Sequence, residues 1–155
     1  MNTHALSSVN TNYFSESKED GSLDIGAIYE KATHHVLKID VNETLSAYGS
    51  EANSTASGFW LGGNSRLIVT NAHVAAPSQI SRMYAEDVHG RKFKVKLVYS
   101  NPLIDLAYLQ PEEDETIQQP QSFFTFSTHP QRNSEVFMIG NNGGGRHRFA
   151  RWTYQ

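Results

Sequence analysis

Two residues whose side chains do acid–base chemistry lie within or beside apolar stretches of this sequence. His73 follows a short β-forming apolar run at residues 67–69, and Asp105 comes 32 residues later as the one carboxylate inside the apolar run 103–109. An ionised carboxylate is costly to bury unless a partner offsets its charge, so we expect a buried Asp105 to face His73. An aspartate that orients a histidine supplies two of the three groups that activate a hydroxyl nucleophile.

Short apolar stretches separated by turn residues must position this pair. Their spacing predicts one short helix and some seven short strands, a pattern typical of a β-barrel or β-sandwich. The helix is expected at residues 25–32, and the strands at residues 36–41, 56–61, 67–70, 78–87, 92–99, 104–109 and 135–139. Between the first two strands, the polar residues 43–55 predict a surface loop, and residues 62–64 predict a tight hairpin turn.

Three further patterns lead to expectations about packing. On the strand at 92–99, lysines alternate with Phe93, Val95 and Leu97, which predicts one solvent-exposed face and one face packed inward. The phenylalanines at 123, 124 and 126 are interpreted as core. Residues 146–155 alternate basic with aromatic side chains; RNA contact is one reading, but the negative net charge favours a strand of a barrel.

Composition limits the function classes. The chain has 155 residues, enough for one domain with a real core, and a formal net charge of −3, which gives no case for nucleic acid or an anionic membrane. No apolar run is long enough to span a bilayer, and no secretory signal is visible, so the compartment is left open. Cysteine is absent, which excludes disulfides and thiolate chemistry. His34 and His35 are adjacent and point to opposite faces of a strand, so we expect no metal and no cofactor.

Six segments, in the same order along the chain, resemble motifs of the HtrA/Deg serine proteases, a branch of the trypsin-like enzymes with the chymotrypsin fold. The histidine motif is Leu67-Ile68-Val69-Thr70-Asn71-Ala72-His73-Val74, and the aspartate motif is Asp105-Leu106-Ala107-Tyr108-Leu109. The other four are the opening helix and first strand at 28–39, Ser57-Gly58-Phe59-Trp60, the hairpin at 87–93 and the strand at 136–141. The chain departs from the family pattern at Ala56, where the family has glycine, and at Asn142, where it has proline, so it resembles a distant member.

The resemblance implies an all-β fold, with the Greek-key six-stranded β-barrel of the trypsin-like two-barrel fold, a short N-terminal helix and the start of a second barrel. Residues 1–22 are then a mobile N-terminal tail, and residues 23–111 the first β-barrel with the His and Asp of the triad. Residues 112–122 become the inter-barrel connector and residues 123–155 the beginning of a second, incomplete barrel. The family often forms trimers and often carries a PDZ domain, so a homo-oligomer is an open alternative.

The resemblance also implies the chemistry. His73 is the expected general base and Asp105 its orienter, in a serine endopeptidase whose substrates are peptides or unfolded proteins. Nothing after Asp105 reads Gly-x-Ser-Gly, so the nucleophilic serine is expected on a second-barrel segment beyond this chain, and the chain alone is predicted to be inactive. An alternative alignment puts Asn142 in the serine's place. Only 37 residues separate Asn142 from Asp105, which is too few to form the strands of a second barrel that would have to precede the serine.

Two other functions remain as alternatives. A protease-derived barrel could bind a peptide or partner without cutting it, as a catalytically inactive binding module. A metal-dependent hydrolase using His73 and Asp105 is the least favoured, because no further ligands fall at usable spacing.

Overall fold

The computed structural model describes residues 24–43, 52–62, 65–75, 82–112, 117–120, 124–129, 131–141 and 148–155. The expectations for residues 1–22, 63–64, 123 and 142 lie outside these residues. The described elements are α1 (Ile25–Thr33), β1 (Val36–Glu43), β2 (Ala52–Trp60), β3 (Ile68–Thr70), α2 (Ala72–Ala75), β4 (Arg82–Glu86), β5 (Lys92–Asn101), β6 (Leu106–Pro111), β7 (Glu135–Gly140) and β8 (Arg148–Thr153). In the described part of the chain, no helix is both long and apolar enough to cross a membrane.

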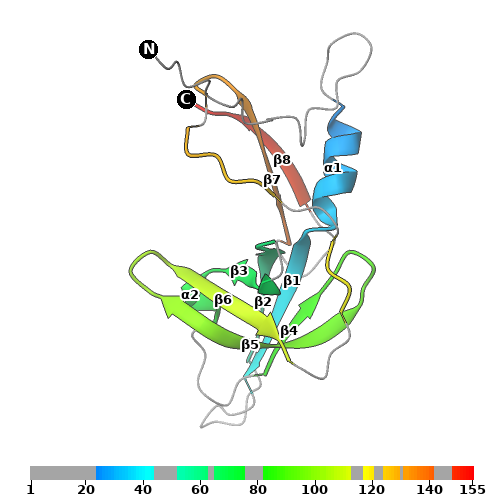
Figure 1. Cartoon of the computed structure of the whole chain (residues 1–155), viewed down its shortest axis with the longest axis vertical. Coiled ribbons are helices and arrows are strands. Elements are labelled where there is room, and N and C mark those ends of the chain that lie inside the picture. The colour runs from blue at the N-terminus through cyan, green and yellow to red at the C-terminus, as the bar shows by residue number, and fades with distance from the viewer. Residues whose placement is uncertain are drawn as a thin grey trace, which may run out of the picture.

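Six of the strands close into an antiparallel barrel, which fills the lower half of Figure 1. The order around it is β1-β2-β3-β6-β5-β4, so two three-stranded meanders join where β3 meets β6 and where β4 meets β1. This is Greek-key connectivity, because strands that are distant in the chain become neighbours in the sheet. The expected all-β fold with a six-stranded Greek-key barrel and a short N-terminal helix is confirmed.

Inward-facing side chains from every strand fill the barrel. β1 contributes Leu37, Ile39 and Val41, all at most 1% exposed, because alternate residues of a strand share one face. The remaining members of the core cluster are Trp60, Ile68, Ala75, Ala85, Phe93, Val95, Ala107 and Leu109. The barrel interior is therefore a packed apolar core, and functional groups are expected at its rims or on its outer surface.

Helix α1 leads into the barrel and is fixed at both ends by local hydrogen bonds. The carboxylate of Asp24 accepts the backbone N–H of Ala27 at 3.2 Å, which satisfies one of the unpaired donors of the first turn. At the other end the hydroxyl of Thr33 donates to the carbonyl of Glu30 at 2.9 Å. The helix thus ends where β1 begins, as the spacing of its apolar residues predicts.

Strands β7 and β8 form a separate two-stranded antiparallel sheet above the barrel, beside α1 (Figure 1). β7 contacts α1, β1 and β2. Asn141, directly after β7, is buried, and its backbone N–H donates to the Ser57 hydroxyl on β2 at 2.7 Å. The strand expected at 135–139 is confirmed, and the basic and aromatic residues near the C-terminus form its partner strand.

The expected loop at 43–55 is wrong at both ends. β1 continues to Glu43, and β2 begins at Ala52 and pairs with β1 residue by residue. Residues 53–55 are polar and exposed, so this part of β2 has no buried face to produce an apolar alternation. Polar composition therefore could not distinguish an exposed strand from a loop.

Three expectations about apolar residues also need correction. Leu97 is 40% exposed, because the pairing of β5 with β6 shifts between Leu97 and Tyr99 and ends the simple alternation. Ile104 is 66% exposed and lies in the turn before β6, not in the strand. Phe126 is 69% exposed, so it is not core, whereas the half-buried Phe124 packs against Phe59. The short helix α2 was not expected.

Candidate active site

His73 is held at the rim of the barrel by the element that precedes it. All three residues of β3 are buried, and the strand pairs with β2 on one side and β6 on the other. The chain then turns into α2, whose Ala72 and Ala75 are each 2% exposed and anchor the turn. His73 lies between these two anchors and faces outward, so its backbone is fixed while its ring reaches the surface.

Asp105 reaches the same rim from the turn between β5 and β6. β6 pairs with β3 through Thr70 and Ala107, so the residue two positions before Ala107 lies near the residue three positions after Thr70. The turn is closed by the Asn101 side chain, which accepts the backbone N–H of Leu103 at 3.1 Å. Barrel register, and not proximity in sequence, brings the aspartate to the histidine.

The two side chains are in direct hydrogen-bonding contact. His73 Nδ1 lies 2.8 Å from Asp105 Oδ2 and 3.0 Å from Oδ1. The backbone N–H of His73 also donates to Oδ1, at 2.9 Å. An ionised carboxylate can only accept, so the shared proton is on Nδ1 and the neutral ring keeps an unprotonated Nε2. A ring held in this tautomer can take a proton from a hydroxyl group placed at Nε2.

The Asn71 side chain is a third donor to the Asp105 carboxylate, besides the ring and the backbone N–H of His73, and it was not predicted from the sequence. Its amide nitrogen lies 3.0 Å from Asp105 Oδ2 and 3.3 Å from the Asp105 carbonyl oxygen. The signal that could have revealed it is its position two residues before His73, at the end of β3. The backbone and ring N–H groups of His73, followed by the His73 charge and the Asn71 amide, hold the pKa of Asp105 below its ordinary value.

The expectation that Asp105 is buried is wrong. Its side chain is 45% exposed and that of His73 is 71% exposed. The reason is that β6 begins at Leu106, directly after Asp105. Asp105 therefore belongs to a rim turn and adopts a positive φ of 52°. This left-handed conformation is one that Asp tolerates better than most residues. The pair is therefore open to solvent on its outer side.

An apolar groove runs over the outside of the barrel and ends at Asp105. Its volume is about 960 Å³, and it lies between β2, β3 and β6 on one side and α1 and β7 on the other. The aromatic and aliphatic side chains along it are Ile28, Val36, Phe59, Leu61, Val69, Ile104, Leu106, Tyr108, Phe124, Phe126, Phe137 and Ile139. Phe124 and Phe126, which we expected in the core, thus line a surface adjoining the site.

Among the described residues, no serine hydroxyl hydrogen-bonds to the imidazole of His73. Nor does that part of the chain contain a group of three histidine, aspartate or glutamate side chains suited to a metal ion. The chemistry that this arrangement offers is proton transfer at Nε2 of an oriented imidazole.

The chain thus combines a closed six-stranded antiparallel barrel with a histidine–aspartate pair at its rim. The family model for the trypsin-like peptidase domain matches residues 56–153, which is more than half of the chain. The chain therefore belongs to the trypsin-like peptidase domain family, and its function class is that of a protease-type hydrolase. A search of curated proteins found no match.

Proposed function

We propose that this chain supplies the histidine and aspartate of an HtrA-type serine endopeptidase. The observation that carries the proposal is the 2.8 Å contact between His73 Nδ1 and Asp105 Oδ2, which leaves Nε2 of an exposed ring available as a base. In this role His73 removes the proton from the serine hydroxyl as it attacks the peptide carbonyl, and later protonates the leaving amine. Asp105 orients the ring and stabilises the imidazolium that forms between these steps.

The HtrA assignment is supported by two features, one before His73 in the sequence and one between His73 and Asp105. The chain enters the first strand from α1, as in the resemblance at residues 28–39. The hairpin at 87–93 resembles the family's aspartate–glycine–arginine hairpin, with Val88 and His89 between Asp87 and Gly90. Asp87 accepts the backbone N–H of Arg91 at 3.0 Å. We take peptides or unfolded proteins as the substrates, because the exposed rim gives an extended chain free access to His73.

For the nucleophile, we propose a Gly-x-Ser-Gly turn on a second-barrel segment outside residues 1–155, since none follows Asp105 in the sequence. In this scheme residues 23–111 are the first barrel, residues 112–122 the connector and residues 123–155 the beginning of the second barrel. The apolar groove of about 960 Å³ that ends at Asp105 supports the proposal, because such a surface is suited to packing against a second barrel. Membership of a peptidase family gives no support to the binding-module alternative.

The test is peptidase activity of the product of the complete reading frame that contains this sequence. We expect it to hydrolyse casein and to be labelled at a serine by a fluorophosphonate. His73→Ala and Asp105→Asn should each lower turnover by about 10,000-fold. His129→Ala is the matched control, because His129 is exposed and its ring hydrogen-bonds to its neighbour Thr128, and it should leave turnover unchanged.

The 155-residue chain by itself should show neither labelling nor hydrolysis. Casein hydrolysis by this chain that disappears in His73→Ala would overturn the proposal that the serine lies elsewhere. A complete product that is labelled but keeps its turnover in His73→Ala would overturn the role of the histidine.

A further inference from the structure

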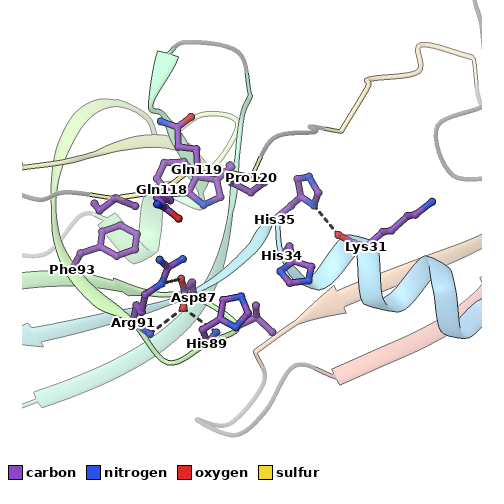
Figure 2. A pocket seen from close by; sticks show the side chains of 13 residues that line it. Lys31, His34, His35, Asp87, His89, Arg91, Phe93, Gln118, Gln119 and Pro120 are labelled. Atoms are coloured by element: carbon purple, nitrogen blue, oxygen red, sulfur yellow. Dashed lines mark hydrogen bonds and ion pairs between the residues drawn. The ribbon is translucent and has the colours of Figure 1, made fainter.

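A second pocket lies at the end of the barrel opposite to the His73–Asp105 pair. Its volume is about 550 Å³, within the range of small-ligand sites, and α1, the β4–β5 turn and residues 117–120 enclose it (Figure 2). The β4–β5 turn and the turn that carries Asp105 flank opposite ends of β5, a strand of 10 residues. At about 3.3 Å per residue the two turns are roughly 30 Å apart, so this pocket is separate from the proposed catalytic site.

Two imidazole rings from different elements meet in this pocket. His34 ends α1 and His89 lies in the β4–β5 turn, and their ring centroids are 5.4 Å apart. Figure 2 shows both on the same side of the pocket. Both residues are exposed, and no side-chain hydrogen bond is made by either ring within the described residues. Their ring nitrogens are therefore available to a ligand.

The neighbouring His35 has a different environment. It is 2% exposed, its ring packs 4.7 Å from that of Phe124, and its Nδ1 donates to the Lys31 carbonyl at 3.0 Å. The ligand-facing pair is thus His34 with His89, and not the adjacent histidines of the sequence.

The hydrogen-bond donors of the pocket suit an anion. Arg91 and Asp87, from the β4–β5 hairpin, are its charged lining side chains, and residues 117–120 add none. Lys31 also borders the pocket, but its side chain points away from it (Figure 2). Asp87 is already engaged, because it accepts Arg91 Nε at 2.7 Å and the backbone N–H of His89 at 2.9 Å. Arg91 and Asp87 therefore offset each other in charge, and the donors left to a bound anion are the remaining N–H groups of Arg91 and the ring N–H groups of His34 and His89.

The uncharged lining suits an organic ligand. Phe93 and Trp60 form an aromatic floor with ring centroids 6.0 Å apart, and both are buried. Gln118 and Gln119 also line the pocket and provide amide donors and acceptors (Figure 2). We propose that this pocket binds a carboxylate joined to a flat apolar group, with the carboxylate between His34 and His89 and the apolar group towards Phe93.

Imidazole resonances in NMR spectra of the 155-residue chain test this site directly. N-acetyl-phenylalanine is the probe, and its C-terminal amide, which lacks only the carboxylate, is the matched control ligand. We expect saturable shifts of the His34 and His89 resonances with the acid and none with the amide. Benzoate should give the same shifts if any small aromatic acid suffices, and no shifts if the peptide unit is also required; either result supports the carboxylate site.

Variants separate this site from a general anion effect. His34→Gln and His89→Gln should each weaken binding of the acid, and the double variant should weaken it most, whereas His129→Gln should not change it. Equal shifts with the acid and its amide would overturn the proposal, as would the absence of shifts at millimolar acid. Inorganic phosphate that displaces the acid at equal concentration would also overturn it, since the site would then not select a carboxylate.

Discussion

The carboxylate of Asp105 accepts both the ring Nδ1–H and the backbone N–H of His73, although 32 residues separate the two in the chain. The ring contact orients the imidazole, and the backbone contact fixes the position of the carboxylate relative to α2. Because one carboxylate makes both bonds, neither side chain can rotate away without losing a charge-assisted hydrogen bond. The barrel register between β3 and β6 is what makes this double contact possible.

The ionisation of Asp105 should report how much each donor contributes. His73→Ala removes the ring contact and the ring charge but keeps the backbone N–H, whereas Asn71→Ala removes the weakest of the causes that lower the pKa. We expect the pKa of Asp105 to rise in both variants, and to rise more in His73→Ala. NMR titration of the Asp105 side-chain carboxyl carbon measures this, and a larger rise in Asn71→Ala would contradict the ordering.

An ion-pair network on the outside of the barrel should make stability depend on pH. Asp40, buried on β1, lies 2.8 Å from Lys92 Nζ and 3.2 Å from Lys38 Nζ. Burial acts to raise the pKa of Asp40, but the hydrogen bonds from Lys92 and Lys38 outweigh it and hold that pKa below the ordinary value. The stabilisation is thus fully present above the ordinary pKa of about 4, and is lost as the pH falls through the lowered one.

Asp40→Asn should accordingly lower the free energy of unfolding by about 2 kcal/mol at pH 7, and by progressively less as the pH falls below about 4. Urea unfolding at a series of pH values measures the difference. Glu30→Gln removes an exposed carboxylate on α1 and serves as the control, with little effect at any pH. A constant difference between Asp40→Asn and the unmodified chain from pH 7 to pH 3 would be inconsistent with this network.

Gly58 should be required for β2 to pack against β3. A Cβ atom at this position would lie 3.0 Å from the Val69 carbonyl oxygen and 3.1 Å from the Ile39 side chain. Because the nearest obstacle is backbone, Gly58→Ala should reduce the free energy of unfolding by about 1 to 3 kcal/mol. Ser54→Ala, at an exposed position of the same strand, should change it by less than about 0.5 kcal/mol. Equal melting behaviour of the two variants would refute the close-packing explanation.

The β7–β8 sheet should make the 155-residue chain self-associate. Met138 and Trp152 lie on one face of this sheet and are 53% and 50% exposed, and an exposed apolar face of this kind favours association. We expect sedimentation of species larger than the monomer, shifted towards the monomer by Met138→Lys with Trp152→Lys. Leu103→Lys, which removes an exposed apolar side chain elsewhere, should leave the distribution unchanged. A strictly monomeric unmodified chain would contradict this expectation.

The sequence was informative where side-chain burial alternates and uninformative where it does not. Leu37, Ile39 and Val41 alternate with polar residues along β1 and face the core, so their positions could be predicted. The same reasoning failed for Leu103 and Ile104, because a run of apolar residues does not show where the partner strand ends and the rim turn begins. Phe126 was misplaced for a similar reason, since an aromatic side chain on an outer groove has the same composition signal as one in a core.

The proposed site followed from the order of motifs, while its details depended on the barrel. The pairing of His73 with Asp105 could be predicted from the order of the motifs, whereas the argument from the cost of burying a carboxylate assumed a burial that Asp105 does not have. The contribution of Asn71 could not be predicted, since it depends on the direction in which the chain leaves β3. The histidine pair of the second pocket was hidden because His34 and His89 are distant in sequence and only the closed barrel brings them together.

The tautomer of the His73 ring tests the central claim most directly, and nitrogen-15 NMR of the 155-residue chain at alkaline pH measures it. We expect the proton on Nδ1 and the resonance of an unprotonated nitrogen at Nε2, with a shift towards the other tautomer in Asp105→Asn, whose amide can donate to Nδ1. A proton found on Nε2 in the unmodified chain, or a tautomer ratio unaffected by Asp105→Asn, would contradict the role of Asp105 as the residue that prepares His73 to act as a base.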